Sequence, residues 1–240
     1  MRRDLQLLYQ TDSYCRSFDA EVIAVDPVLN AVQLSATAFY PGGGGQPCDT
    51  GVLSCNGRAV PVPKVQKGHW HVLDGALPAV GAVVRGEIDW ETRYRLMRIH
   101  TALHVLCGVV FRTYGALVTG GDMQPLHGRM DFEFERMQRD LVDEIEARIN
   151  AEVAAARDVR VQLLPREEAF QIPDLIRTRI NLLPEGITEV RTVEIVGLDL
   201  QACGGTHLAN TSEIGHLRIS DYKSKGGINK RIYLEVVDAP

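Results

Sequence analysis

Four side chains that suit one metal ion stand in two short motifs far apart in the chain, and this pairing constrains the fold. The first motif is His100-Thr-Ala-Leu-His104, inside an apolar run, and the second is Cys203-Gly-Gly-Thr-His207. If the first motif is helical, its two imidazoles lie one turn apart on the same face. The glycines of the second motif allow a sharp bend between the thiol and the imidazole. We therefore expect the fold to bring a helix and a distant turn together.

Three imidazole nitrogens and one thiolate sulfur form a ligand set that favours zinc, so we expect one Zn²⁺ per chain at His100, His104, Cys203 and His207. If all four side chains bind, the site is closed and structural. If one of them is displaced, a water or a substrate oxygen can enter, and the site is catalytic. Either motif alone also occurs in ordinary helices and turns, and three and four protein ligands both remain open from the sequence. The other histidines are expected to be structural or solvent-facing: His69, His71, His127 and His216.

The composition of the 240 residues is that of an ordinary globular protein, with 45% hydrophobic and 24% charged residues. No apolar run reaches the roughly 18 residues of a membrane span, so no membrane partner is expected. The first residues lack the apolar core of an export signal. The five cysteines are odd in number and irregularly spaced, which argues against a disulfide framework. These features predict a cytoplasmic protein.

A net charge of −5 does not indicate a nucleic-acid binder, but the charge is unevenly distributed. Basic residues cluster near the C-terminus, at Lys223, Lys225, Lys230 and Arg231. A local basic patch can hold a phosphate backbone on an acidic protein. The alternative is a solvated hairpin with ordinary lysines.

The pattern of apolar residues and glycines changes near residue 90, which predicts a domain boundary there. Residues 1–90 have alternating apolar residues and frequent glycine turns, which predict a small β-barrel with strands within 19–39 and near 52–54, 59–65, 69–73 and 82–89. Residues 91–240 predict a two-layer α/β domain with a zinc cleft, so the expected fold class is α+β. Its expected elements are helices at 91–113 and 136–156, a short helix after Pro165, two strands within 116–135, strands at 159–164 and 187–196, and a hairpin of 215–223 with 228–237. The long second helix is expected to bury Leu141, Ile145, Ile149 and Val153.

The two metal motifs, read with their flanks, closely resemble the editing domain of alanyl-tRNA synthetase and its free-standing relatives, the AlaX proteins. The resemblance covers nearly the whole chain. The Gly-rich segment 37–51 resembles the N-terminal domain of the longer AlaX type, and residues 225–231 resemble the basic turn of the family. Threonyl-tRNA synthetase has a related editing domain with the same ligand spacings, but it lacks this Gly-rich segment. No stretch resembles an ATP-binding synthetase core.

The resemblance implies a zinc-dependent aminoacyl-tRNA deacylase that does not use ATP. A pocket for alanine cannot strongly reject glycine, because a missing methylene is worth only about 1–3 kcal/mol, and serine is also hard to exclude. A second, hydrolytic site corrects such errors. The expected substrate is tRNA(Ala) mischarged with serine, and tRNA(Ala) mischarged with glycine is a second expected substrate. The four metal-binding residues named above carry over as the zinc ligands of the family.

The resemblance also implies roles for other residues. The family's selectivity is associated with a threonine in the strand after the His-bearing helix, and Thr119 falls at that place. Its hydroxyl and methyl are expected to read the serine side chain, while the plainer interpretation is a β-branched residue that suits a strand. We also expect substrate or tRNA contacts from Gly204 and Gly205.

The Gly42–Gln46 run is a Gly-rich loop in the N-terminal part. No Lys-Ser or Lys-Thr follows it, so it is not expected to be a P-loop. Its Gly-Gly-Gln resembles the tripeptide of peptide-release factors, which also cleave a tRNA ester. We expect Gly44, Gly45 and the catalytic candidate Gln46 to lie near the zinc cleft or the tRNA acceptor end. The alternative is a wide turn between barrel strands.

Two other functions are compatible with the same residues. One is a non-catalytic tRNA-binding module with a structural zinc. The other is a zinc hydrolase that acts on another aminoacyl ester, such as a D-aminoacyl-tRNA. The sequence leaves the oligomeric state open.

Overall fold

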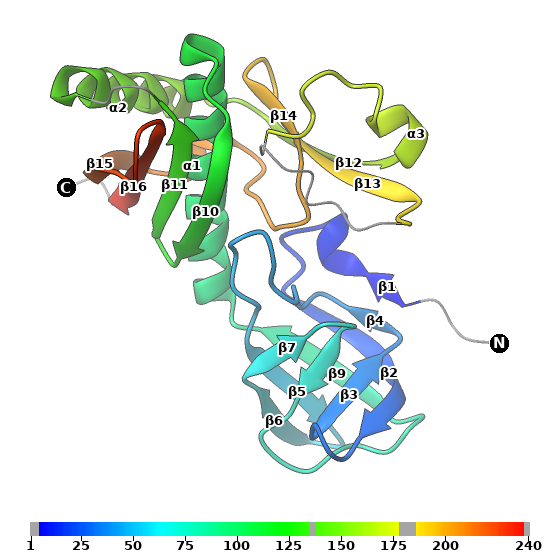
Figure 1. Ribbon diagram of the computed structural model, residues 1–240. Coiled ribbons are helices and arrows are strands. Elements are labelled where there is room, and N and C mark those ends of the chain that lie inside the picture. The colour runs from blue at the N-terminus through cyan, green and yellow to red at the C-terminus, as the bar shows by residue number, and fades with distance from the viewer. Residues whose placement is uncertain (1–4, 135–137, 178–185, 238–240) are drawn as a thin grey trace. The chain divides into compact units, whose positions relative to one another are not determined.

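The structure is a computed structural model that describes residues 5–134, 138–177 and 186–237 (Figure 1). The chain divides into two compact units, residues 1–94 and 95–240. The first helix, α1 (Trp90–Tyr114), begins in the N-terminal unit and continues into the C-terminal unit.

The N-terminal unit contains a seven-stranded antiparallel sheet with the spatial order β6-β5-β9-β2-β3-β8-β7. A short parallel pair, β1 with β4, and one turn of 3-10 helix, η1, accompany it. The element bounds are β1 Gln6–Leu7, η1 Leu8–Gln10, β2 Ser17–Asp26, β3 Ala31–Leu34, β4 Ala36–Thr37, β5 Gly51–Cys55, β6 Arg58–Val62, β7 Lys64–Gln66, β8 Trp70–Val72 and β9 Val83–Ile88.

The expected β-barrel is corrected to a curled, half-barrel sheet. Its two outermost strands, β6 and β7, follow each other in the chain and are separated only by Pro63. The predicted strand 59–65 is therefore two strands. Proline has no N–H to donate and is confined to sheet edges and breaks, which explains the interruption. Among the described residues, no hydrogen-bonded ladder joins β6 to β7, so the sheet curls without closing.

Alternation of apolar and exposed residues places the core of this unit on one face of the sheet. In β9, Val84, Gly86 and Ile88 are buried while their neighbours are exposed. Gly86 leaves room for the ring of Phe18 on β2, because a Cβ there would lie 2.4 Å from that ring. Phe18 in turn packs edge-on against Phe39, with ring centroids 5.9 Å apart.

A buried ion pair joins the start of α1 to the segment that carries the Gly-rich loop. The side chain of Arg93 is fully buried, and its Nε donates to Asp49 Oδ1 at 2.8 Å while Nη2 donates to Asp49 Oδ2. The same guanidinium donates to the carbonyls of Ser13 (3.0 Å) and Ala38 (2.7 Å). Asp49 Oδ2 also accepts the N–H of Tyr40 at 2.6 Å. One guanidinium thus donates hydrogen bonds to the carboxylate of Asp49 and to the backbone carbonyls of two other segments.

In its described residues, the C-terminal unit has two sheets, the α-helices α2 and α3, most of α1, and one turn of 3-10 helix, η2. One sheet has the order β10-β11-β16-β15 and the other β12-β13-β14, all antiparallel. The element bounds are β10 Val118–Gln124, β11 His127–Glu133, α2 Arg139–Ala154, β12 Val159–Pro165, α3 Arg166–Ala169, β13 Glu189–Ile195, β14 Asp199–Ala202, η2 Thr211–Glu213, β15 His216–Ser224 and β16 Asn229–Val237. These bounds agree with the predicted elements within a few residues, except that β14 and η2 were not predicted and that residues 136–137 of the predicted second helix lie outside the described part.

Two glycines allow α1 to approach both sheets closely. A Cβ on Gly128 of β11 would lie 3.0 Å from side-chain atoms of Ile99 and Leu103 on α1. A Cβ on Gly108 of α1 would lie 2.9 Å from Asp199, the first residue of β14. The helix is therefore packed between the four-stranded sheet and the β13–β14 connection, and its buried face includes His100 and His104.

Helix α2 buries Val142, Ile145 and Ile149, so the predicted stripe is corrected at two positions: Leu141 and Val153 are only half-buried, and Val142 is buried instead. A second, polar contact docks this helix on the edge strand β15. Asn150 accepts from the N–H of Leu217 (2.9 Å) and donates to its carbonyl (2.8 Å). Glu146 accepts from the N–H of Ile219 at 2.6 Å. Side chains of α2 thus satisfy backbone groups that an edge strand would otherwise leave open.

All five cysteines are free thiols. Within the described ranges, no helix combines the length and the apolar character that crossing a membrane requires.

The Arg93–Asp49 pair gives the first testable prediction. Asp49→Asn keeps the shape of the side chain but leaves a guanidinium buried without its counter-charge, so it should destabilise the N-terminal unit by about 3–5 kcal/mol. The free energy of unfolding, from urea titration followed by circular dichroism, measures the change.

The matched control is Glu87→Gln, which removes an exposed ion pair with Arg85 (3.1 Å) in the same unit. That change should stay within about 0.5 kcal/mol of the parent protein. If Asp49→Asn were as mild as this control, the pair would not have the structural importance assigned to it.

Candidate metal centre

The two motifs come together in the C-terminal unit, on α1 and on the loop after β14. His100 and His104 are one helical turn apart on α1, with ring centroids separated by 5.1 Å. The ring of His207 lies against both, at 4.1 Å from His100 and 4.4 Å from His104. Cys203 completes the group, and one donor atom from each of the four residues lies within 4.8 Å of all the others.

The spacing of these donors fits a tetrahedral metal site. Cys203 Sγ is 3.3 Å from His207 Nε2 and 3.6 Å from His100 Nε2. Ligands at bond lengths of about 2.3 Å for sulfur and about 2.0 Å for nitrogen lie roughly 3.5 Å apart around tetrahedral zinc. The ring of His104 adds a buried Nδ1 with no hydrogen-bond partner in the described part of the chain. A buried nitrogen of this kind is unfavourable unless a partner satisfies it.

The electrostatics of the cluster favour the charge states that metal binding needs. The three imidazoles outweigh the effect of burial and lower the pKa of the Cys203 thiol well below its ordinary value. Burial, aided by the other two imidazoles, lowers the pKa of His207 well below its ordinary value, and burial also lowers the pKa of His100. A thiolate next to neutral imidazoles is the ionisation state in which these groups bind a metal. His104 differs, because the Cys203 thiolate and Asp199 outweigh burial and raise its pKa.

Backbone contacts hold the Cys203 loop in place. The N–H of Cys203 donates to the carbonyl of Arg191 on β13 (3.0 Å), and Nη1 of Arg191 donates to the carbonyl of Cys203 (2.7 Å). The N–H of Gly205 points at Cys203 Sγ, at 3.4 Å. Gly204, by contrast, is exposed, and a Cβ on it would contact no atom within 4 Å. Of the two glycines predicted to contact substrate, Gly205 is therefore also part of the loop's internal structure.

Sequence reasoning missed Thr101, Arg191 and Asp199 around the cluster. Thr101 is fully buried on α1, and its Oγ1 lies 3.3 Å from His207 Nδ1. A hydroxyl residue inside an otherwise apolar helical run was a signal that could have drawn attention to it. Arg191 and Asp199 carried no such signal, because only the unpredicted β13–β14 pairing brings them to the site.

Thr119 lies on β10 at an irregularity of the β10–β11 ladder, and its side chain is exposed. Its hydroxyl donates to Asn229 Oδ1 at 3.1 Å. Its part in selectivity stays a prediction.

The Gly-rich loop belongs to the N-terminal unit and is internally organised. Gly42 to Gly45 all have positive φ, at 86°, 133°, 57° and 87°, a conformation that only glycine adopts readily. Two backbone hydrogen bonds close the loop between Gly43 and Gln46, at 3.0 and 2.9 Å, and the side chain of Gln46 is buried. The proximity of this loop to the metal cluster or to tRNA stays a prediction.

Three of the four basic residues predicted to contact phosphate have partners within the chain, and two of these three, Lys230 and Arg231, are largely shielded from solvent. Lys230 is buried, and its Nζ donates to the carbonyls of Gly226 (3.0 Å) and Gly227 (2.6 Å) in the hairpin turn. Arg231 makes a bidentate ion pair with Asp131, at 2.6 and 2.7 Å. Lys223 forms an exposed ion pair with Asp221 (2.9 Å), and Lys225 is exposed. The phosphate-binding prediction is therefore best directed at Lys223 and Lys225.

The remaining histidines have the expected structural or solvent-facing positions. His71 is buried with its Nε2 2.8 Å from Thr37 Oγ1, and burial lowers its pKa to about 4. His69 contacts the hydroxyl of Tyr9 at 3.0 Å, whereas His127 and His216 are exposed.

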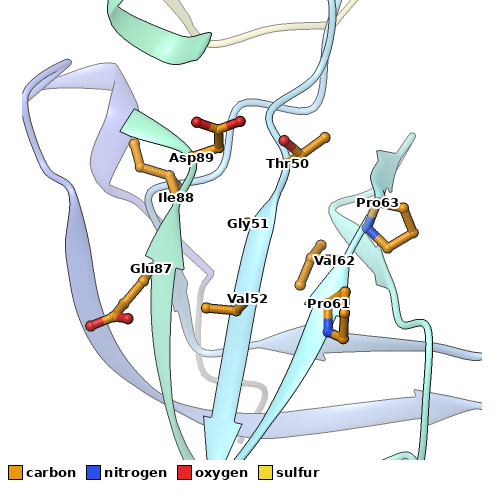
Figure 2. Close-up of a pocket in the computed structure, with 9 residues that line it drawn as sticks. All are labelled: Thr50, Gly51, Val52, Pro61, Val62, Pro63, Glu87, Ile88 and Asp89. Carbon is orange, nitrogen blue, oxygen red and sulfur yellow. The ribbon is translucent and has the colours of Figure 1, made fainter. Parts of the chain in front are cut away.

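A pocket in the N-terminal unit offers less chemistry than the cluster. Figure 2 shows its lining residues, which come from β5, β6, β9 and the residues next to them and are mainly glycine, proline, valine and isoleucine. Its two carboxylates are Glu87 and Asp89. Asp89 is already engaged at the start of α1, where it accepts from the N–H (3.2 Å) and the hydroxyl (2.8 Å) of Thr92. The functional assignment therefore rests on the cluster.

Comparison with known proteins agrees with this site. Residues 190–233 match the threonyl and alanyl tRNA synthetase second additional domain, the segment that contains Cys203 and His207. The alanine–tRNA ligase of Ignicoccus hospitalis is 41% identical over 92% of this chain, and the matched part is 25% of the length of that ligase. The alanyl-tRNA editing protein AlaX-M of Saccharolobus solfataricus is 39% identical over 95% of this chain and 98% of its own length. That of Methanosarcina acetivorans is 38% identical over 97% of this chain and 99% of its own length. With such identity over almost the whole of both chains, this protein belongs to the AlaX-M family of alanyl-tRNA editing proteins.

Proposed function

We propose that this protein is a trans-editing hydrolase that deacylates tRNA(Ala) mischarged with serine, and that Gly-tRNA(Ala) is its second substrate. The observation that carries the proposal is the group of four donor atoms within 4.8 Å of one another in a chain of the AlaX-M family. The bond to be hydrolysed is the ester between the amino acid and the terminal ribose of the tRNA.

We further propose that the group holds one Zn²⁺. The combination of one thiolate with three imidazoles favours zinc over Mg²⁺ or Ca²⁺, which prefer oxygen ligands. Bound there, the ion would supply a Lewis acid for the ester carbonyl or for a water. The protein's own part is to hold the four donors together and to keep the three rings away from bulk water, with 6%, 6% and 2% of His100, His104 and His207 exposed.

A second candidate is a non-catalytic tRNA-binding module with a structural zinc. The presence of four protein donors favours it, because catalytic zinc sites usually have three protein ligands and one open position. The two candidates differ in one measurable respect: only the hydrolase releases the amino acid, and only in the presence of the metal.

The metal prediction follows from this difference. The purified protein should contain one zinc per chain by elemental analysis, and Cys203→Ser should lose most of it. Removal of the metal with a chelator should abolish the hydrolysis of Ser-tRNA(Ala), and added zinc should restore it.

His127→Ala is the matched control, because its side chain is 66% exposed and stands outside the cluster. This variant should retain both zinc and activity. Zinc-loaded parent protein that leaves Ser-tRNA(Ala) intact would favour the structural-zinc module, and hydrolysis that resists the chelator would contradict a role for the metal.

We propose that Thr119 selects the serine side chain. Its hydroxyl donates to Asn229 (3.1 Å), which leaves its lone pairs free to accept a hydrogen bond from the seryl hydroxyl. Thr119→Val should lower the preference for Ser-tRNA(Ala) over Ala-tRNA(Ala) by about tenfold, the equivalent of one hydrogen bond.

The ratio of kcat/KM for the two substrates measures this preference. Thr119→Ser keeps the hydroxyl and is the control that should retain most of the preference, and zinc content should be equal in all three proteins. An unchanged ratio in Thr119→Val would exclude the assignment.

We propose that Gln46, together with Gly44 and Gly45, contacts the acceptor end of the substrate. The support is a loop fixed by two backbone hydrogen bonds and by the hydroxyl of Tyr40, which donates to the carbonyl of Gly43 at 3.0 Å. A loop of small residues with an ordered backbone allows a close approach of the ligand.

Gln46→Ala should therefore reduce kcat/KM for Ser-tRNA(Ala) by about tenfold while zinc content stays the same. Gln33→Ala is the control, since Gln33 donates to the carbonyl of Gly68 (2.8 Å) in the same unit. Equal losses in both variants would mean that the effect is a general destabilisation.

A further inference from the structure

Thr101 connects the helix of the metal centre to its loop through two hydrogen bonds. Its side chain is fully buried. The N–H of Leu208 donates to Thr101 Oγ1 at 3.1 Å, and the same oxygen lies 3.3 Å from His207 Nδ1. One hydroxyl on α1 thus contacts two consecutive residues of the loop that carries Cys203 and His207.

The surroundings make a hydroxyl at this position informative. Its neighbours on the helix, Ala102 and Leu103, are buried apolar residues, as are Val105 and Leu106. A hydroxyl in such an environment costs free energy unless it is hydrogen-bonded, and valine would fill nearly the same space without that cost. The hydroxyl is therefore explained by the two contacts it makes with the loop.

The geometry of the His207 ring gives one of these contacts a chemical consequence. His207 Nε2 lies 3.3 Å from Cys203 Sγ, on the side of the ring that faces the other donors, while Nδ1 faces Thr101. A neutral imidazole has one N–H and one lone pair, and only the nitrogen with the lone pair can bind a metal. If Nδ1 carries the hydrogen and donates it to Thr101, the lone pair of Nε2 is directed at the cluster.

We propose that Thr101 is a positioning residue that fixes the Nδ1–H tautomer and the ring orientation of His207, so that Nε2 is held ready for the metal. The inference rests on the proposed metal site and extends it to a residue that is not itself a donor. Partners of this kind at the second nitrogen of a metal-binding histidine typically contribute tenfold to a hundredfold in affinity. The ring of His104 has no hydrogen-bond partner at Nδ1 within the described residues, so the two rings are supported differently.

The test compares zinc affinity in three variants of the full chain, by competition with a chromophoric chelator. Thr101→Val removes the hydroxyl and keeps the β-branched shape, and it should weaken zinc binding by about tenfold to a hundredfold. Thr101→Ser keeps the hydroxyl and should restore the affinity to within about threefold of the parent.

Thr211→Val is the matched control. Thr211 is another fully buried threonine of the same unit, and its hydroxyl accepts from the N–H of Arg157 (2.8 Å) and donates to the carbonyl of Glu152 (3.1 Å). It is not one of the four donors and should leave zinc affinity unchanged even if it lowers stability. Equal losses of affinity in Thr101→Val and Thr211→Val, or none in Thr101→Val, would overturn the proposal.

A measurement on the parent protein keeps the proposal falsifiable if Thr101→Val does not fold. In the zinc-loaded protein with ¹⁵N-labelled histidine, NMR should show His207 protonated at Nδ1 and not at Nε2. The opposite tautomer would overturn the proposal.

The outcomes also separate this inference from the proposed function. If the parent binds zinc and Thr101→Val weakens that binding, but Ser-tRNA(Ala) is not hydrolysed, the deacylase is wrong and the role of Thr101 stands. If hydrolysis occurs and Thr101→Val does not change the zinc affinity, the role proposed for Thr101 is wrong and the proposed deacylase activity stands. A parent protein that binds no zinc would overturn both.

Discussion

Burial of three imidazoles next to a half-buried thiol is the constraint on which the C-terminal unit depends. Such groups are unfavourable in a dry interior unless they satisfy one another or share a ligand. Here they come from two segments that are distant in the chain, so the helix and the loop must be held together by other means. Gly108 and Gly128 allow the helix to lie close to both sheets, and the antiparallel pairing of β13 with β14 brings Cys203 to the helix. The polar group is therefore assembled by the packing of apolar elements around it.

In the N-terminal unit, hydrogen bonds and an ion pair hold the Gly-rich segment in place. Its Gly-rich segment has little side-chain surface to bury, so its position depends on backbone hydrogen bonds and on Asp49 next to it. The guanidinium of Arg93 bonds to Asp49 and to two backbone carbonyls, and it enters the unit from the first turns of α1.

The sequence predicted most of the elements and the four donors, because each depends on local patterns. The His-x3-His spacing on α1, the hairpin of β15 and β16 and the alternation in β9 are all short-range signals. The errors arose where a non-local effect decides the outcome. Pro63 divides one predicted strand, and the pairing with β13 makes a strand of residues 199–202, whose own composition is not typical of one. Lys230 and Arg231 were predicted to contact phosphate, which stays a prediction. Their partners within the chain, the turn carbonyls and Asp131, were not foreseen, because they depend on the register of β16 against its neighbours. Thr101 belonged to the motif itself, and only the folded loop reveals what its hydroxyl contacts.

The docking of α2 on β15 blocks one edge of the four-stranded sheet against pairing with a strand of another chain. Leu217 and Ile219 would otherwise present backbone groups to any extended segment in solution, as unprotected sheet margins do. The side chains of Asn150 and Glu146 take the place of a neighbouring strand, because they accept hydrogen bonds from the backbone of β15. Side chains cannot extend the sheet by pairing with a further strand. Among the described strands of this sheet, β10 forms the opposite margin, where the N–H of Val118 donates to the carbonyl of Arg177. The sheet is thus built to end on one side, which makes runaway self-association through that side unfavourable.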